Sequence, residues 1–178
     1  MRKKRKPLDK ELVKKISNHL KYDPETGHFF WFNPTSLKSK RGWFAGSLFG
    51  GKGYLGFRVF WEKYYAHRLA WALSYGECPA ELEIDHVNGN KADNRLSNLR
   101  LATASQNQHN KTAYKNNSSG VKGVNRDGKS GKWRAKFNLH GKRYELGLFD
   151  SLDSARDAVV RARSEAHGQF ANHGEGLI

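Results

Sequence analysis

Four side chains in the middle of the chain could together hydrolyse a phosphodiester bond. Asp85 and His86 are adjacent, Asn98 follows twelve residues after His86, and Asn107 follows nine residues after Asn98. An imidazole is largely neutral at about pH 7 to 8, so His86 can be the general base that deprotonates water. The Asp85 carboxylate and the Asn107 side-chain oxygen are hard ligands suited to one divalent metal ion, Mg²⁺ or Mn²⁺.

The residues around these side chains predict the elements that would position them. We expect a strand at Glu83–His86, a loop rich in Asn, Asp and Gly, a second short strand at Leu96–Leu101, and a helix with Thr103 as its N-cap. Such a finger can bring Asp85, His86 and Asn107 around a single point. Asn98 would hold the loop after His86 through side-chain to backbone hydrogen bonds.

Residues 65–111 resemble the HNH nuclease family, particularly its phage-type homing endonucleases. The resemblance is carried by HRLAW at 67–71, IDHVNGN at 84–90, DNRLSNLR at 93–100 and SQN at 105–107. In that family the first motif His is the general base, the Asp before it binds metal and the middle Asn is structural. The resemblance implies these roles for His86, Asp85 and Asn98. The third motif position, commonly His, is Asn107 here, as in some homing members.

The charge balance predicts a polyanionic partner. The 178 residues include 32 Lys and Arg against 17 Asp and Glu, a formal net charge of +15, which favours salt-sensitive binding to nucleic acid. We expect double-stranded DNA and no membrane, since no apolar run approaches the length of a membrane span. One cysteine excludes an intramolecular disulfide. The expected location is the cytoplasm, the host cytoplasm if the protein is phage-encoded.

The polar stretch 114–120 predicts a linker, after which a second pattern begins. Strands are expected at Val121–Asn125, Trp133–Leu139 and Lys142–Phe149, followed by a helix capped by Asp150 or Ser151 and closed by Gly168. In the middle strand, apolar residues alternate with Arg134, Lys136 and Asn138, which predicts one buried face and one polar, largely basic face.

Residues 117–171 resemble the DNA-binding domain of plant ethylene-response and Apetala-type transcription factors. The matching segments are SGVKGV at 119–124, GKWRAKF at 131–137 and GKRYELGLF at 141–149. In that family a three-stranded sheet lies in the major groove, which implies contacts from Lys122, Asn125, Asn138 and Arg143. The alternation adds Arg134 and Lys136 as DNA contacts. The chain has Asn138 and Glu145 where the family has arginine and tryptophan, so the plant target sequence is not implied.

The predicted fold class is α+β: an HNH ββα-metal finger nuclease domain, then a small three-stranded antiparallel sheet with a helix. The predicted divisions are a basic arm and helix at 1–21, a nuclease domain at 22–113, the linker at 114–120, a DNA-binding domain at 121–171 and a tail at 172–178. His67 and Arg68, near the start of a helix expected at Tyr65–Tyr75, are further candidate DNA contacts, although His67 could simply pack.

The predicted function is a metal-dependent DNA endonuclease of the homing type, which nicks one strand or cuts both with His86 as general base and acts as a monomer or a homodimer. One alternative is a sequence-specific DNA-binding regulator that retains an inactive HNH remnant. A second alternative is an RNA-binding protein that uses the same basic surfaces.

Overall fold

The computed structural model describes residues 7–49, 51, 53–109, 117–139 and 141–173. The chain forms two compact units, Met1–Thr103 and Ala104–Ile178, and each contains its own hydrophobic core. The predicted basic arm at 2–6, the linker residues 114–116 and the tail from 174 onward lie outside the described residues. Within the described part of the chain, no helix is long and apolar enough to cross a membrane.

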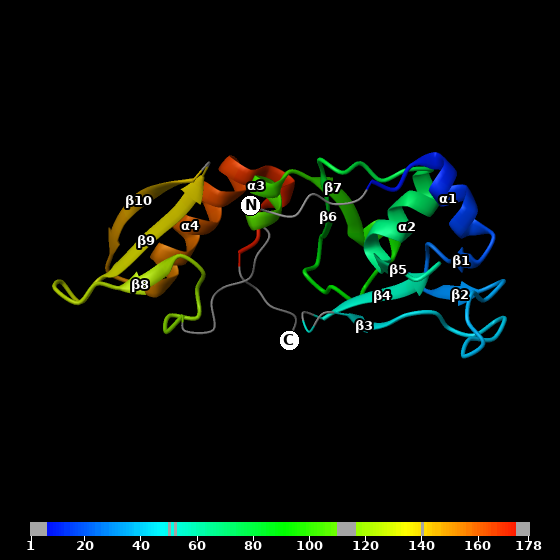
Figure 1. Ribbon diagram of the computed structural model, residues 1–178. Coiled ribbons are helices and arrows are strands. Elements are labelled where there is room, and N and C mark those ends of the chain that lie inside the picture. Colours follow the sequence, from blue (N-terminus) through cyan, green and yellow to red (C-terminus); the bar gives the residue numbers. More distant parts are fainter. Residues whose placement is uncertain (1–6, 50, 52, 110–116, 140, 174–178) are drawn as a thin grey trace. The chain divides into compact units, whose positions relative to one another are not determined.

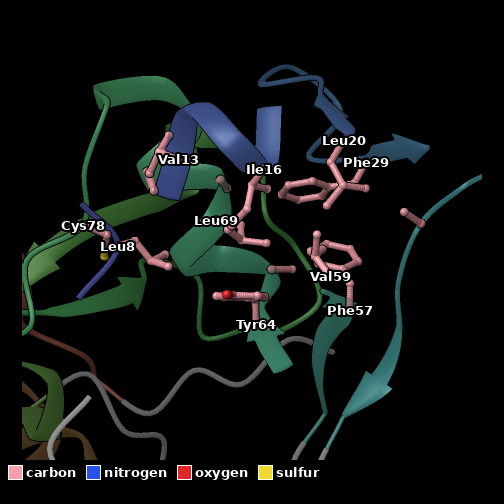
Figure 2. Close-up of a cluster of buried hydrophobic side chains, with 14 of the residues drawn as sticks. Leu8, Val13, Ile16, Leu20, Phe29, Phe57, Val59, Tyr64, Leu69 and Cys78 are labelled. Carbon is pink, nitrogen blue, oxygen red and sulfur yellow. The ribbon is translucent and has the colours of Figure 1, made fainter. Parts of the chain in front are cut away.

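Two helices pack in the core of the first unit. Helix α1 (Lys10–Ser17) begins after Asp9, whose carboxylate accepts a 2.9 Å hydrogen bond from the backbone N–H of Leu12. Helix α2 (Ala66–Tyr75) ends at Gly76, which has the left-handed φ of 85° typical of a helix C-terminus. Figure 2 shows Val13 and Ile16 from α1 and Leu69 from α2 gathered with apolar residues of the neighbouring strands.

Two antiparallel sheets complete that core. Strands β1 (Leu20–Tyr22) and β2 (Phe29–Trp31) pair with each other, and β4 (Tyr54–Val59) lies between β3 (Ser47–Phe49) and β5 (Glu62–Tyr65). The sequence predicts a basic arm and helix at 1–21, but α1 stops at Ser17, and Leu20 belongs to β1 and pairs with Trp31. Strand β4 turns back into β5 at Phe60 and Trp61, which both have positive φ.

The segment that carries the candidate chemistry forms a separate hairpin in the first unit. Strand β6 (Glu83–His86) confirms the predicted bounds, and it pairs antiparallel with β7 (Leu99–Ala102). A single turn of 3-10 helix, η1 (Leu96–Asn98), precedes β7, so the strand starts later than predicted. Helix α3 (Ala104–His109) follows directly after Thr103, as expected.

The second unit contains a three-stranded antiparallel sheet and a long helix. The sheet order is β10 (Lys142–Phe149), β9 (Trp133–Leu139), β8 (Val124–Arg126), and the bounds of β9 and β10 confirm the predicted strands. Helix α4 (Leu152–His167) is capped by the Ser151 side chain and followed by the 3-10 turn η2 (Gly168–Phe170). Helix α4 lies against one face of this sheet (Figure 1), where its Ala155 and Val159 pack on Val124 and Ala135.

The turn between β1 and β2 supports the loop that follows His86. The backbone N–H of Leu96 donates to the carbonyl of Pro24 at 3.0 Å, and the Tyr22 hydroxyl donates to the carbonyl of Asn94 at 2.7 Å. Gly27 has a φ of +73°, and a Cβ there would lie 2.4 Å from the backbone nitrogen of Arg95. Only glycine permits this approach of two backbones.

Gly27→Ala therefore tests the contact between the turn and the loop. Because the substitution combines a strained φ with a backbone clash, we expect a loss of about 3 kcal/mol in the free energy of unfolding, measured by urea denaturation. Gly76→Ala is the matched control, since Gly76 has a φ of +85° but open space where its Cβ would be. Equal losses for the two variants would contradict a close approach at Gly27.

Candidate active site

The β6–β7 hairpin presents Asp85 and His86 in an unusually buried setting. All four residues of β6 are buried, including Glu83, Asp85 and His86. The register places Asp85 opposite Arg100 and His86 opposite Leu99. Ionisable side chains are rarely buried without a compensating partner, so the neighbours of each side chain decide what it can do.

Asp85 is compensated by Arg100. The guanidinium approaches one carboxylate oxygen, Oδ2, with its Nη2 at 2.8 Å and its Nε at 2.9 Å. The side chains are only 6% and 14% exposed, so solvent screens this ion pair weakly. Arg100 thus supplies the positive charge that keeps a carboxylate stable at this position of the hairpin.

His86 is surrounded by aromatic rings and by the side-chain amide of Asn94. Its Nε2 is 3.4 Å from Oδ1 of Asn94, and its ring centroid is 5.0 Å from that of His67 in an edge-to-face arrangement. Burial lowers the pKa of His86 below 6.5, although the contact with Asn94 and the charge of Asp85 act in the opposite direction. The imidazole is therefore neutral at pH 7, the state that a general base requires.

The loop between the strands is fixed by its own amide and carboxylate side chains. Asn98 accepts a 2.9 Å hydrogen bond from the backbone N–H of Asn88 and donates at 2.8 Å to the carbonyl of Asp93. These are side-chain to backbone bonds of the kind that its expected structural role requires. The Asp93 carboxylate accepts from Arg95 and Asn88, and hydrogen bonding with Arg95 lowers the pKa of Asp93 to about 2.

His67 and Arg68 lie in the first turn of α2 and are both buried. The His67 ring is 5.2 Å from Tyr54 and stacks on Tyr65 at 5.6 Å, measured between ring centroids. His67 therefore belongs to the surroundings of His86. A phosphate contact by His67 or Arg68 stays a prediction, and it would require the phosphate to reach this buried cluster.

Asn107 lies on α3, which belongs to the second compact unit. Its convergence with Asp85 stays a prediction. Among the described residues, no group of three or more His, Cys, Asp and Glu side chains is arranged to hold a metal ion. The predicted site needs a smaller set, one carboxylate and one amide.

Sequence reasoning missed several residues that surround His86 and Asp85. Asn94, Tyr54 and Arg100 come from three different segments. The alternation of β6 and β7 could have pointed to Arg100, because opposite charges often face each other across an antiparallel pair. Tyr54 gives no local signal, since it reaches the site through the packing of β4.

The outer face of the C-terminal sheet carries five of the predicted DNA contacts. Cross-strand partners share a face of a sheet, and the register pairs Asn125 with Arg134, Lys136 with Glu145, and Asn138 with Arg143. The opposite face packs on α4 through Ala135 and Val124. The polar side chains therefore form one surface that α4 does not cover. Arg134 also forms an ion pair with Asp127.

Lys122 is placed differently from the other predicted contacts. Its ammonium donates to the carbonyl of Asn172 at 2.9 Å, and burial together with the nearby charge of Arg163 lowers its pKa to about 8. Gly123, with a φ of +79°, brings this segment against Arg163 and the Lys136 carbonyl. A DNA contact by Lys122 stays a prediction, and it requires the side chain to leave this arrangement.

Comparison with known proteins identifies the family. Residues 64–109 match the model of the HNH endonuclease family. Protein 3.8 of Escherichia phage T7 is 33% identical over 115 residues, which are 65% of this chain and 94% of that protein. An uncharacterised HNH endonuclease of Acanthamoeba polyphaga mimivirus is 30% identical over 138 residues, 76% of this chain and 67% of that protein. No solved structure matches.

The chain belongs to the HNH endonuclease family. Membership points to a nuclease, and a nuclease domain of this family implies DNA as the substrate. The comparisons therefore confirm the predicted resemblance for the segment around His86.

The ion pair between Asp85 and Arg100 can be tested through stability. Arg100→Leu leaves a buried carboxylate without its counter-charge, so we expect a loss of about 3 kcal/mol in the free energy of unfolding at pH 7. The double variant Asp85→Asn, Arg100→Leu removes both charges and should recover part of that loss. Additive losses in the double-mutant cycle would contradict a direct interaction between the two side chains.

Proposed function

We propose that the protein is a metal-dependent DNA endonuclease of the homing type, with His86 as its general base. The observation that carries the proposal is the buried, neutral imidazole of His86 directly beside the buried carboxylate of Asp85. A buried imidazole with a lowered pKa beside a buried acidic side chain at the end of one strand is characteristic of catalytic sites.

In the proposed reaction, His86 takes a proton from a water molecule as its oxygen attacks phosphorus. The bond from phosphorus to the 3′-oxygen breaks, and that oxygen takes up a proton from solvent, which gives a 5′-phosphate and a 3′-hydroxyl. The contact from Nε2 to the Asn94 amide oxygen orients the ring; when Nε2–H donates to that oxygen, Nδ1 is the basic nitrogen. Asn98 and Asp93 hold the loop that fixes this orientation.

The donor chemistry fits a hard divalent ion, because a buried carboxylate and an amide oxygen are ligands that Mg²⁺ and Mn²⁺ accept. Asp85 and Asn107 would hold the ion, which would supply Lewis acidity and stabilise the leaving oxygen. Arg100 now balances the charge of Asp85 through one carboxylate oxygen. A bound cation would neutralise part of the negative charge of Asp85 in place of Arg100.

The C-terminal unit would supply affinity for the DNA duplex. The surface formed by Asn125, Arg134, Lys136, Asn138 and Arg143 supports this role, because arginine and asparagine can read base edges while lysine holds phosphate. The resemblance to the Apetala and ethylene-response domains is consistent with the order of three strands and one helix. We propose a two-domain arrangement in which the sheet binds and the hairpin cuts.

The number of active sites that act on the DNA determines whether one strand or both strands are cut. With one site in each chain, a monomer would nick a single strand, whereas a double-strand break would need a homodimer or two successive visits. Both oligomeric states are compatible with the proposal.

A plasmid assay tests the chemistry. We expect purified protein to nick supercoiled plasmid with Mg²⁺ or Mn²⁺ and to be inactive with chelator, and His86→Ala should lower the rate by at least about a hundredfold. Because burial holds the pKa of His86 below 6.5, activity should persist at that pH and decline as the imidazole becomes protonated below it.

The control is DNA retention in a gel-shift experiment with chelator, which His86→Ala should leave unchanged. Normal retention without nicking under any divalent metal would favour the DNA-binding regulator with an inactive HNH remnant.

The binding role of the sheet is tested by salt dependence. Lys136→Ala with Arg143→Ala should weaken duplex binding and reduce the slope of log affinity against log salt by about 0.9 for each phosphate that the variant no longer neutralises. Arg156→Ala with Arg161→Ala removes the same charge from α4, which covers the opposite face of the sheet. If both pairs changed the slope equally, the effect would reflect net charge and not a specific surface.

A further inference from the structure

An aromatic surface in the first unit has no role in the proposed chemistry. Side chains of β2 and of His28 before it alternate between the two faces of the strand. Phe29 and Trp31 enter the core, whereas His28 and Phe30 face solvent. Phe44 lies beside Phe30 through an isolated antiparallel bridge, which extends the exposed face by one chain segment. Lys21, the partner of Phe30 on β1, is exposed on the same face. We call Lys21, His28, Phe30, Phe44 and the neighbouring Arg41 the aromatic platform.

The rings of the platform form a contiguous cluster. His28 lies 5.1 Å from Phe44 and 6.4 Å from Phe30, and Phe30 lies 6.4 Å from Phe44, all in edge-to-face arrangements. Phe44 is 50% exposed and Phe30 is 36% exposed. Single exposed aromatics are ordinary, but a cluster of them indicates a binding surface.

Cations flank this cluster. The Lys21 ammonium lies 4.7 Å and the Arg41 guanidinium 4.5 Å from the ring centroid of Phe32, which follows β2. Lys40 lies 5.2 Å from the ring of Trp43, itself 53% exposed. The carboxylates of Asp23 and Glu25 belong to the turn before β2, at the His28 end of the platform, where Asp23 interacts electrostatically with His28; the cations lie at the Phe32 end. The charge therefore suits a polyanion with flat apolar groups.

We propose that the aromatic platform binds unpaired bases of single-stranded DNA. Phe30 and Phe44 offer faces on which successive bases stack, and Lys21 and Arg41 contact the phosphates between them. Bases within a duplex already stack on each other, so exposed rings gain this contact only from unpaired bases. The proposal rests on DNA being the substrate of the nuclease domain, but not on cleavage, and the platform is separate from His86.

Binding in the presence of chelator tests the platform in the full-length protein. The probes are a fluorescent oligothymidine of about fifteen nucleotides, within the range of single-strand site sizes, and a duplex of equal length. Phe30→Ala with Phe44→Ala should weaken single-strand binding about tenfold or more and change duplex binding less than twofold. The matched control is Leu48→Ala with Trp61→Ala, since these side chains are 73% and 92% exposed and lie outside the platform.

Salt dependence separates stacking from charge. Lys21→Ala with Arg41→Ala should reduce the slope of log affinity against log salt by about 0.7 for each phosphate left without its cationic partner, whereas the phenylalanine variants should keep the slope of the unmodified protein. Phe30→Tyr with Phe44→Tyr retains the ring faces and should restore single-strand binding. That restoration also decides the matter if the alanine variants fold poorly.

Photocrosslinking with 5-iodouracil in the oligonucleotide gives a direct readout on the unmodified protein. We expect the crosslinked peptide to contain Phe30 or Phe44. Crosslinks confined to other segments, or equal weakening of single-strand and duplex binding in the alanine variant, would overturn the proposal. Because these measurements need no metal and no cleavage, their failure leaves the nicking assay unaffected, and a failed nicking assay leaves them interpretable.

Discussion

The buried ion pair between Asp85 and Arg100 is the interaction on which the candidate site depends. A carboxylate in the interior must be compensated, and here the compensation comes from the directly opposite residue of the hairpin. The same pairing favours the observed register of β6 and β7, because a slip of one residue would turn Asp85 away from Arg100 and leave a buried carboxylate without its counter-charge. The ion pair therefore forms only in this register of the two strands, and the ion pair in turn stabilises that register.

The loop after His86 is ordered by contacts from both sides. From within, Asn98 and Asp93 satisfy the loop backbone. From outside, Tyr22 and the turn at Gly27 pack against the backbone of residues 94 and 95. Orientation of a catalytic imidazole needs such support, since small displacements of a reacting group are costly. The N-terminal hairpin thus has a structural connection to the chemistry, although it contains none of the predicted catalytic residues.

The sequence predicts the strands that have a strong periodic pattern, and it misses the short strands that form only because a neighbouring strand pairs with them. Strands β9 and β10 follow from apolar alternation and clear turn residues, and the end of β6 follows from the loop rich in Asn, Asp and Gly after it. Strands β1 and β3 have three residues each and exist because β2 and β4 pair with them. The turn at Phe60 and Trp61 uses positive φ without glycine, which no local rule anticipates.

The same distinction applies to the site. The roles proposed for His86 and Asn98 follow from motif spacing, but the lowering of the His86 pKa comes from burial, which only the fold supplies. For Lys122, the role suggested by the motif differs from the position that the structure gives its side chain. Position within the motif suggests a DNA contact, whereas the turn at Gly123 directs its ammonium to the carbonyl of Asn172.

The buried thiol of Cys78 can be used to follow local opening of the first unit. It is the single cysteine of the chain, it is buried, and its backbone exchanges two hydrogen bonds with Leu8. A thiol reagent can reach the sulfur only when the packing around this pairing opens. The labelling rate of the native protein therefore measures how readily the packing around Cys78 opens, through local or complete unfolding.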